Sequence, residues 1–154
     1  MAEQLKNIYS QEFIKKLSNS LQNSYKDFKK DEFKKAIFTN AWESFELKQR
    51  MRHISKTLYQ FLPFSYKEQI EILIEVKQDF KALEAIIFQD FVEIFGLDDF
   101  EVSMKALEVF TIDSSSEFAI RQFILKYEDK TIKRMKLWAK SQNEHIRRLA
   151  SEGS

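Results

Sequence analysis

The chain of 154 residues contains no cysteine, one proline and two glycines. Without cysteine it can form neither a disulfide framework nor a thiolate metal site. So few helix breakers favour long helices joined by short turns. The longest aliphatic-aromatic run, residues 85–88, is too short to cross a membrane, and the first ten residues lack the apolar segment of a secretory signal. These absences predict a cytoplasmic protein with no membrane contact.

Apolar residues recur at helical spacing, and no stretch keeps the alternation of a β-strand. The pattern predicts one all-α domain covering residues 1–154, with about nine helices. Four of them are expected to begin at polar residues, which are Ser10, Asp27 or Asp31, Ser65, and Asp98 or Asp99. Two more are expected over residues 47–62, ended by Pro63, and over residues 82–95, ended by Gly96.

The three last helices have their own polar starts, which are Ser114, Asp129 and Asn143. Ser114 stands three residues before Glu117, which is the spacing of a capping box, and Gly153 is the expected final stop. The strings IRQF (120–123) and IRRL (146–149) are offset by 26 residues. Such a repeat favours antiparallel helix pairs stacked into a right-handed solenoid, and a plain helical bundle is the alternative.

The net charge of +1 hides a strong asymmetry. Residues 68–101 contain ten acids and two bases, a net charge of −8, whereas residues 121–148 contain nine bases and three acids, a net charge of +6. A one-sided basic surface is typical of a protein with a polyanionic partner. The alternative is a pair of solvated helix faces.

Two strings in the second half resemble the AlkC-type branch of the AlkC/AlkD family of DNA alkylation-repair glycosylases. They are GLDDFEVSMKALEVFT followed by DSSSEFAIRQF, and the pattern W-A-x-x-x-N-E-H-I-R-R-L-A-S-E-G, and the upstream ELKQRMRHIS (46–55) is similar to the same family. The resemblance implies a HEAT-like solenoid that holds duplex DNA in its concave face. It also implies hydrolysis of the N-glycosidic bond of cationic alkylated bases such as 3-methyladenine, without base flipping. We expect a monomer that needs no cofactor.

Two acids of the family's active site match Glu117 and Glu152. Carboxylates near the reacting sugar would stabilise its oxocarbenium character more in the transition state than in the ground state. Each acid also has a structural interpretation. Glu117 suits a capping box, and Glu152 could form a surface ion ladder with Arg148 and Glu144. Glu152 is set against the helix dipole, which disfavours an anion in the last turn.

Three arginines are candidate phosphate contacts, because a guanidinium matches phosphate bidentately: Arg121, Arg147 and Arg148. For Arg121 the alternative is an ion pair with Glu117, four residues earlier. Three aromatic residues are expected in the core, namely Phe118, Phe123 and Trp138. His53 and His145 lack the spacing of metal ligands, so no metal site is predicted. The sequence does not assign Trp42 to the core or to the surface.

The family pattern continues beyond the residue that corresponds to Ser154. The chain is therefore expected to be an N-terminal fragment of a longer protein and to be inactive by itself. The alternative function is a non-catalytic helical-repeat scaffold that binds protein or nucleic acid.

Overall fold

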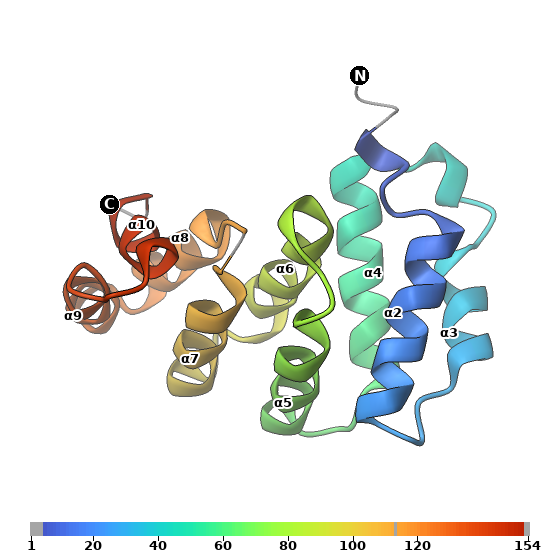
Figure 1. Cartoon of the computed structure of the whole chain (residues 1–154), viewed down its shortest axis with the longest axis horizontal. Helices are drawn as coiled ribbons and strands as arrows, with labels where there is room; N and C mark the ends of the chain where they lie inside the picture. The colour runs from blue at the N-terminus through green and yellow to red at the C-terminus, as the bar shows by residue number, and fades with distance from the viewer. Residues whose placement is uncertain (1–4, 113, 153–154) are drawn as a thin grey trace. The chain divides into compact units, whose positions relative to one another are not determined.

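The computed structural model describes residues 5–112 and 114–152, apart from the side chain of Glu152. Over these residues the chain forms nine α-helices and two short 3-10 helices, with no β-strand (Figure 1). The predicted all-α class is confirmed. Across the same residues, no helix has both the length and the apolar character needed to span a bilayer. The chain divides into two compact units, Met1–Phe80 and Lys81–Ser154, and the single domain stays a prediction.

The first unit is built from five elements: α2 (Gln11–Ser24), α3 (Lys30–Ile37), the 3-10 helix η1 (Trp42–Ser44), α4 (Leu47–Phe61) and α5 (Tyr66–Lys77). Helix α2 packs against α3 and α5, and α3 packs against α4. Ser10 caps α2 as predicted, since its Oγ accepts from the backbone N–H of Phe13 at 3.1 Å. Helix α3 begins at Lys30, one residue before Asp31.

Trp42 is buried in the first unit, beside an arginine that is itself only 3% exposed. The Arg50 guanidinium lies 4.7 Å from the centroid of the indole ring. Its Nη1 donates to the carbonyl oxygen of Lys6 at 3.2 Å, and its Nη2 lies 3.7 Å from a carboxylate oxygen of Glu43. The ring, the carbonyl and the carboxylate offset part of the cost of burying this charge, while the buried Nε has no hydrogen-bond partner among the described residues. Trp42 is thus a core residue that joins η1 to α4.

The second unit follows with six elements: the 3-10 helix η2 (Ala82–Ala85), α6 (Ile86–Phe95), α7 (Phe100–Phe110), α8 (Glu117–Lys126), α9 (Glu128–Trp138) and α10 (Glu144–Glu152). Helix α8 packs against α6 and α9, and α9 packs against α10. The helix predicted over 82–95 ends at Phe95 with Gly96 as its C-cap, as predicted, but it is not one continuous α-helix. Its first turn is a 3-10 helix that starts from Ala82, whose φ of 54° is unfavourable for a residue with a Cβ.

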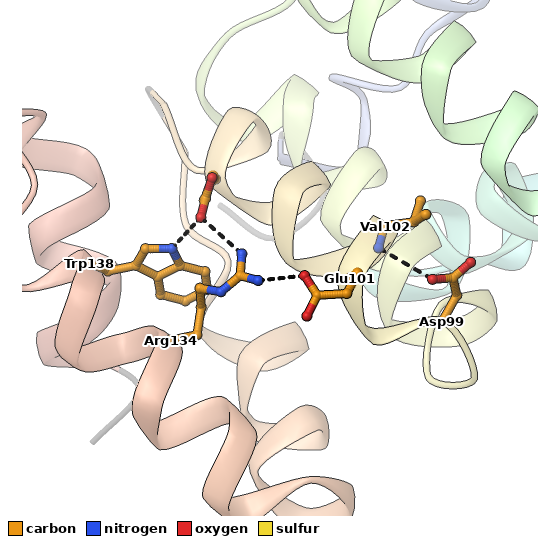
Figure 2. A network of polar contacts seen from close by, with 6 residues as sticks. Asp99, Glu101, Val102, Arg134 and Trp138 are labelled. Atoms are coloured by element: carbon orange, nitrogen blue, oxygen red, sulfur yellow. Dashed lines mark hydrogen bonds and ion pairs between the residues drawn. The ribbon is translucent and has the colours of Figure 1, made fainter.

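A polar network connects α9 to α7 in the second unit (Figure 2). Arg134 bridges two carboxylates, with 2.7 Å to Glu101 and 3.4 Å to Glu108. The indole Nε1 of Trp138 donates to Glu108 at 2.6 Å, so the buried ring keeps its polar group satisfied. Asp99 caps α7 as predicted, since its Oδ1 accepts from the N–H of Val102 at 3.3 Å. Helices α7 and α9 are therefore linked by an ion pair and by side-chain hydrogen bonds.

A substitution at Phe110 can test the packing of the second unit. Its ring is fully buried and lies 5.5 Å from that of Phe88, between centroids. Phe110→Ala should lower the free energy of unfolding by about 3–5 kcal/mol, because it deletes buried area and leaves a cavity. Urea denaturation followed by circular dichroism measures it. Phe64→Ala is the matched control, since that ring is 99% exposed, and it should change stability by less than about 0.5 kcal/mol. Equal effects would contradict the packing described here.

Candidate functional site

Helix α8 begins differently from the predicted capping box. The helix starts at Glu117, its N-cap is Ser116, and no side-chain bond from that serine caps it. The Oγ of Ser115 accepts from the N–H of Glu117 at 3.2 Å. The predicted pairing of Ser114 with Glu117 is therefore wrong. The cap predicted at Asp129 is wrong as well, because α9 starts at Glu128 after the N-cap Tyr127.

Ser114 is buried and forms the hub of the turn that leads into α8. Its Oγ donates to the carbonyl oxygen of Phe110 at 2.7 Å and accepts from Nε2 of Gln89 at 2.6 Å. Its carbonyl oxygen accepts from Nη2 of Arg148 at 3.0 Å. Helices α6, α7 and α10 thus meet at one residue, three positions before Glu117. This turn determines where α8 begins and where the side chains of its first turn point.

Gln89 was not identified from the sequence, although its amide also donates to the carbonyl oxygen of Phe110 at 2.7 Å. The available signal was weak: a single amide side chain within the apolar run of α6. An amide side chain is usually buried only where it has hydrogen-bond partners, because burying an unpaired amide costs free energy. The partners come from 21 and 25 residues further along the chain, and no local pattern reveals them.

The structure joins two of the predicted site residues directly. Glu117 and Arg121 form an ion pair one turn apart on α8, with side chains that are 31% and 55% exposed. Phe118 lies beside them, and its ring centroid is 5.8 Å from the Arg121 guanidinium carbon. The ion pair agrees with the alternative interpretation of Arg121. It also places a carboxylate, a guanidinium and an aromatic ring together on an accessible part of α8.

Phe118 contradicts the prediction that it belongs to the core, because it is 62% exposed. The buried face of α8 is formed by Ala119, Ile120 and Phe123, so Phe118 falls outside the buried stripe by helical geometry. Phe123 and Trp138 are buried as predicted. Helical spacing alone did not separate Phe118 from Phe123, because both are apolar and only the packing of α6 and α9 decides which face is covered.

Helix α10 carries the other predicted residues. Asn143 caps it as predicted, since its Oδ1 accepts from the N–H groups of His145 at 2.8 Å and Ile146 at 3.3 Å. Nη1 of Arg147 donates to the carbonyl oxygen of Ser141 at 2.8 Å, and Arg147 lines a hollow of about 390 Å³ shared by α9 and α10. The side chain of Glu152 lies outside the described residues.

Gly153, the predicted stop, is also outside the described residues. Of the predicted site residues, Glu117 and Arg121 form an ion pair, and Arg148 contacts the turn that precedes them. Among the residues that are described, no group of three or more His, Cys, Asp or Glu side chains could hold a metal ion.

The basic segment 121–148 is partly neutralised inside its own unit. Lys126 contacts Asp98 at 2.6 Å, and Arg134 contacts Glu101 at 2.7 Å, so acids of the segment 68–101 meet bases of the segment 121–148. The hydrogen bond from Lys126 lowers the pKa of Asp98, and the same bond raises the pKa of Lys126. Part of the positive charge that the sequence analysis attributed to binding a polyanion is therefore used in ion pairs within the second unit.

The importance of the hub can be tested with Ser114→Ala. Removal of the hydroxyl leaves the buried Gln89 amide with one acceptor fewer, so the free energy of unfolding should fall by about 1–3 kcal/mol. Ser151→Ala, at an exposed position of α10, should stay within about 0.5 kcal/mol. Urea denaturation of both variants gives the comparison, and a neutral Ser114→Ala variant would rule out the hub as a stabilising feature.

The exposed pair of Lys126 and Asp98 gives a pH prediction. The lowered pKa of Asp98 means that its contribution is present above about 3.9 and is lost as the pH falls through the folded value. The raised pKa of Lys126 means that its contribution is present below about 10.4 and is lost as the pH rises through the folded value. Asp98→Asn should therefore lower the pKa of Lys126, measured by NMR titration of its side chain. Asp27→Asn should leave that pKa unchanged, and equal responses would contradict the pairing.

Comparison with known proteins places this geometry in context. No family model matches the chain. The chain is 45% identical over 150 residues to the uncharacterized protein YhaZ of Bacillus subtilis (strain 168), an alignment that covers 97% of this chain and 42% of YhaZ.

The fold is similar to that of the Pseudomonas fluorescens alkylpurine DNA glycosylase AlkC bound to DNA containing an abasic site analog, with a TM-score of 0.90 and 32% identity. That match covers 97% of this chain and 42% of AlkC, so the chain spans about two fifths of the length of each of these two proteins. Over 97% of its length the chain thus has a helical fold similar to that of AlkC, and its sequence is similar to those of AlkC and YhaZ.

Proposed function

We propose that this chain is part of a DNA glycosylase that hydrolyses the N-glycosidic bond of cationic alkylated bases, such as 3-methyladenine, in duplex DNA. The observation that carries the proposal is the likeness of its fold to AlkC, at a TM-score of 0.90 over 97% of the chain. Glu117 at the accessible start of α8 is consistent with it, because a carboxylate is the group that this reaction needs. The protein acts in the cytoplasm, as a monomer, without a cofactor and without base flipping.

The reaction suits an anionic side chain. An N3-alkylated purine already carries a positive charge, so the bond between the sugar C1′ and the base nitrogen breaks with its electron pair moving to the base. The sugar then develops oxocarbenium character, which a carboxylate stabilises. A water oxygen forms the new bond to C1′ and loses a proton to the carboxylate or to solvent. Glu117 is the proposed source of that carboxylate, together with Glu152.

In the free chain the charge of Glu117 is balanced by Arg121. A DNA phosphate competes for the same guanidinium, since both anions accept from its fork of N–H groups. Transfer of Arg121 from Glu117 to a phosphate would leave the carboxylate uncompensated when the duplex is bound. The ion pair thus fits a site that becomes fully anionic only in the presence of its substrate.

Arg147 and Arg148 are proposed as further phosphate contacts on α10. Nη2 of Arg148 donates to the carbonyl oxygen of Ser114. A phosphate bound by Arg148 would therefore also hold the turn that leads to Glu117. DNA binding and the position of the carboxylate would be coupled through one side chain.

The proposal predicts a cellular phenotype. Expression of the protein, in the form its own cell makes, should restore resistance to a methylating agent in a bacterium that lacks 3-methyladenine glycosylases. Glu117→Gln should restore at least tenfold less survival at equal expression, because it removes the charge that stabilises the transition state. Lys140→Gln is the control and should behave as the unchanged protein.

The 154-residue chain by itself is expected not to release 3-methyladenine from methylated duplex DNA. Release by this chain would contradict that expectation. If the full gene product gave neither resistance nor base release, the glycosylase proposal would be replaced by the scaffold function.

A further inference from the structure

Ala82 has a backbone conformation that its side chain disfavours. Over residues 5–112 and 114–152 it is the one residue with a positive φ, at 54°. In this region the Cβ atom of an L-residue approaches the following carbonyl oxygen, which lowers the population of the conformation by about five- to thirtyfold. The methyl group of Ala82 is exposed and has no polar atom that could bond to the backbone. The conformation is therefore maintained by the segments on either side of Ala82.

The segment before Ala82 is fixed to helix α2 of the first unit. The hydroxyl of Ser20 donates to Oδ2 of Asp79 at 2.6 Å, and Nζ of Lys16 donates to the carbonyl oxygen of Asp79 at 2.8 Å. The ring of Phe80 is buried and lies edge-on to that of Phe13, with 5.4 Å between centroids. Nζ of Lys16 also lies 4.6 Å from the centroid of the Phe80 ring. Residues 79 and 80 therefore belong firmly to the first unit.

The segment after Ala82 is fixed to the second unit. The 3-10 helix η2 packs against α6, and Ala85 at its end is fully buried. The backbone N–H of Ile86 donates to the carbonyl oxygen of Leu83, which continues the chain into α6. Lys81 and Ala82 are both exposed, and the boundary between the two compact units falls at Lys81. These two residues join one anchored segment to the other.

We infer that residues 81 and 82 form a hinge with two states. Ala82 is left-handed in one state and has an ordinary negative φ in the other. Lys81 is extended, with φ −141° and ψ 163°, and this conformation is compatible with either state of the next residue. A change at Ala82 leaves the contacts of Asp79, Phe80 and Ala85 in place and turns one unit relative to the other, as hinges do.

The penalty on a left-handed alanine makes the hinge sensitive to a partner. A penalty of five- to thirtyfold is small enough for a partner that contacts both units to select either state. A glycine would adopt the left-handed conformation without this penalty, so it would favour that state alone. The inference concerns the chain itself and does not depend on the proposed glycosylase activity.

Distances between spin labels measured by double electron–electron resonance test the inference in the full chain. Because the chain contains no cysteine, labels attach only to Gln60→Cys in the first unit and Lys133→Cys in the second, which are both exposed positions. The label pair is measured with Ala82 unchanged, with Ala82→Gly and with Ala82→Pro. Proline fixes φ near about −65° and excludes the left-handed state. It fits here because Lys81 is extended and the first residue of a helix has no intrahelical acceptor for its N–H.

The two substitutions should separate two distance populations. Ala82→Pro should give one population, and the chain with Ala82 should contain that population together with a second. Ala82→Gly should raise the second population relative to the first by about five- to thirtyfold. The matched control is Ala41→Gly, at an exposed alanine that precedes the 3-10 helix η1 with an ordinary φ of −78°. This control should keep the distribution of the chain with Ala82.

Three results would overturn the hinge. The first is one distribution shared by the chain with Ala82, Ala82→Gly and Ala82→Pro. The second is a chain with Ala82 that matches Ala82→Gly, because the left-handed turn would then be strained but fixed. The third is loss of native packing in Ala82→Pro, which the chain's two tryptophans report separately, Trp42 in the first unit and Trp138 in the second. Both indole N–H signals should keep their native NMR positions if the hinge moves and the units stay folded.

Discussion

The turn around Ser114 is the constraint on which the candidate site depends. Its hydroxyl and carbonyl are held by Gln89 from α6, Phe110 from α7 and Arg148 from α10. A buried polar group is costly unless its partners are present, so this turn is stable only when those three helices are packed. Helix α8 starts directly after it. The position of Glu117 is thus a consequence of tertiary packing rather than of a local cap.

Several basic side chains of this chain form ion pairs with its own acidic side chains. Lys126 and Arg134 meet acids within the second unit, and Glu117 meets Arg121. Helix α4 contains no acid, and its Arg50 lies near Glu43, which precedes the helix. Where a base is already bound by an acid, it contributes less to attracting a polyanion.

The likeness to AlkC and to YhaZ extends over almost the whole chain but covers about two fifths of either protein. Fold similarity of this kind identifies a scaffold, while chemistry belongs to particular side chains placed on it. We propose Glu117 and Arg121 on α8 as those side chains. Their accessible ion pair, with the exposed ring of Phe118 beside it, is consistent with the proposed DNA binding and transition-state stabilisation.

The sequence by itself determined the all-α class, most helix positions, the caps at Ser10, Asp99 and Asn143, and the family resemblance. These features are local, because helical periodicity and caps depend on residues within a turn or two. Only the tertiary structure decided that Ser114 points inward, that Phe118 is exposed and that Trp42 and Arg50 share the core. Each of these depends on partners distant in the chain, and a stretch such as Ser114–Ser115–Ser116 offers several equivalent local choices. Packing selects among them, since Ser114 contacts Gln89 of α6, Phe110 of α7 and Arg148 of α10 together.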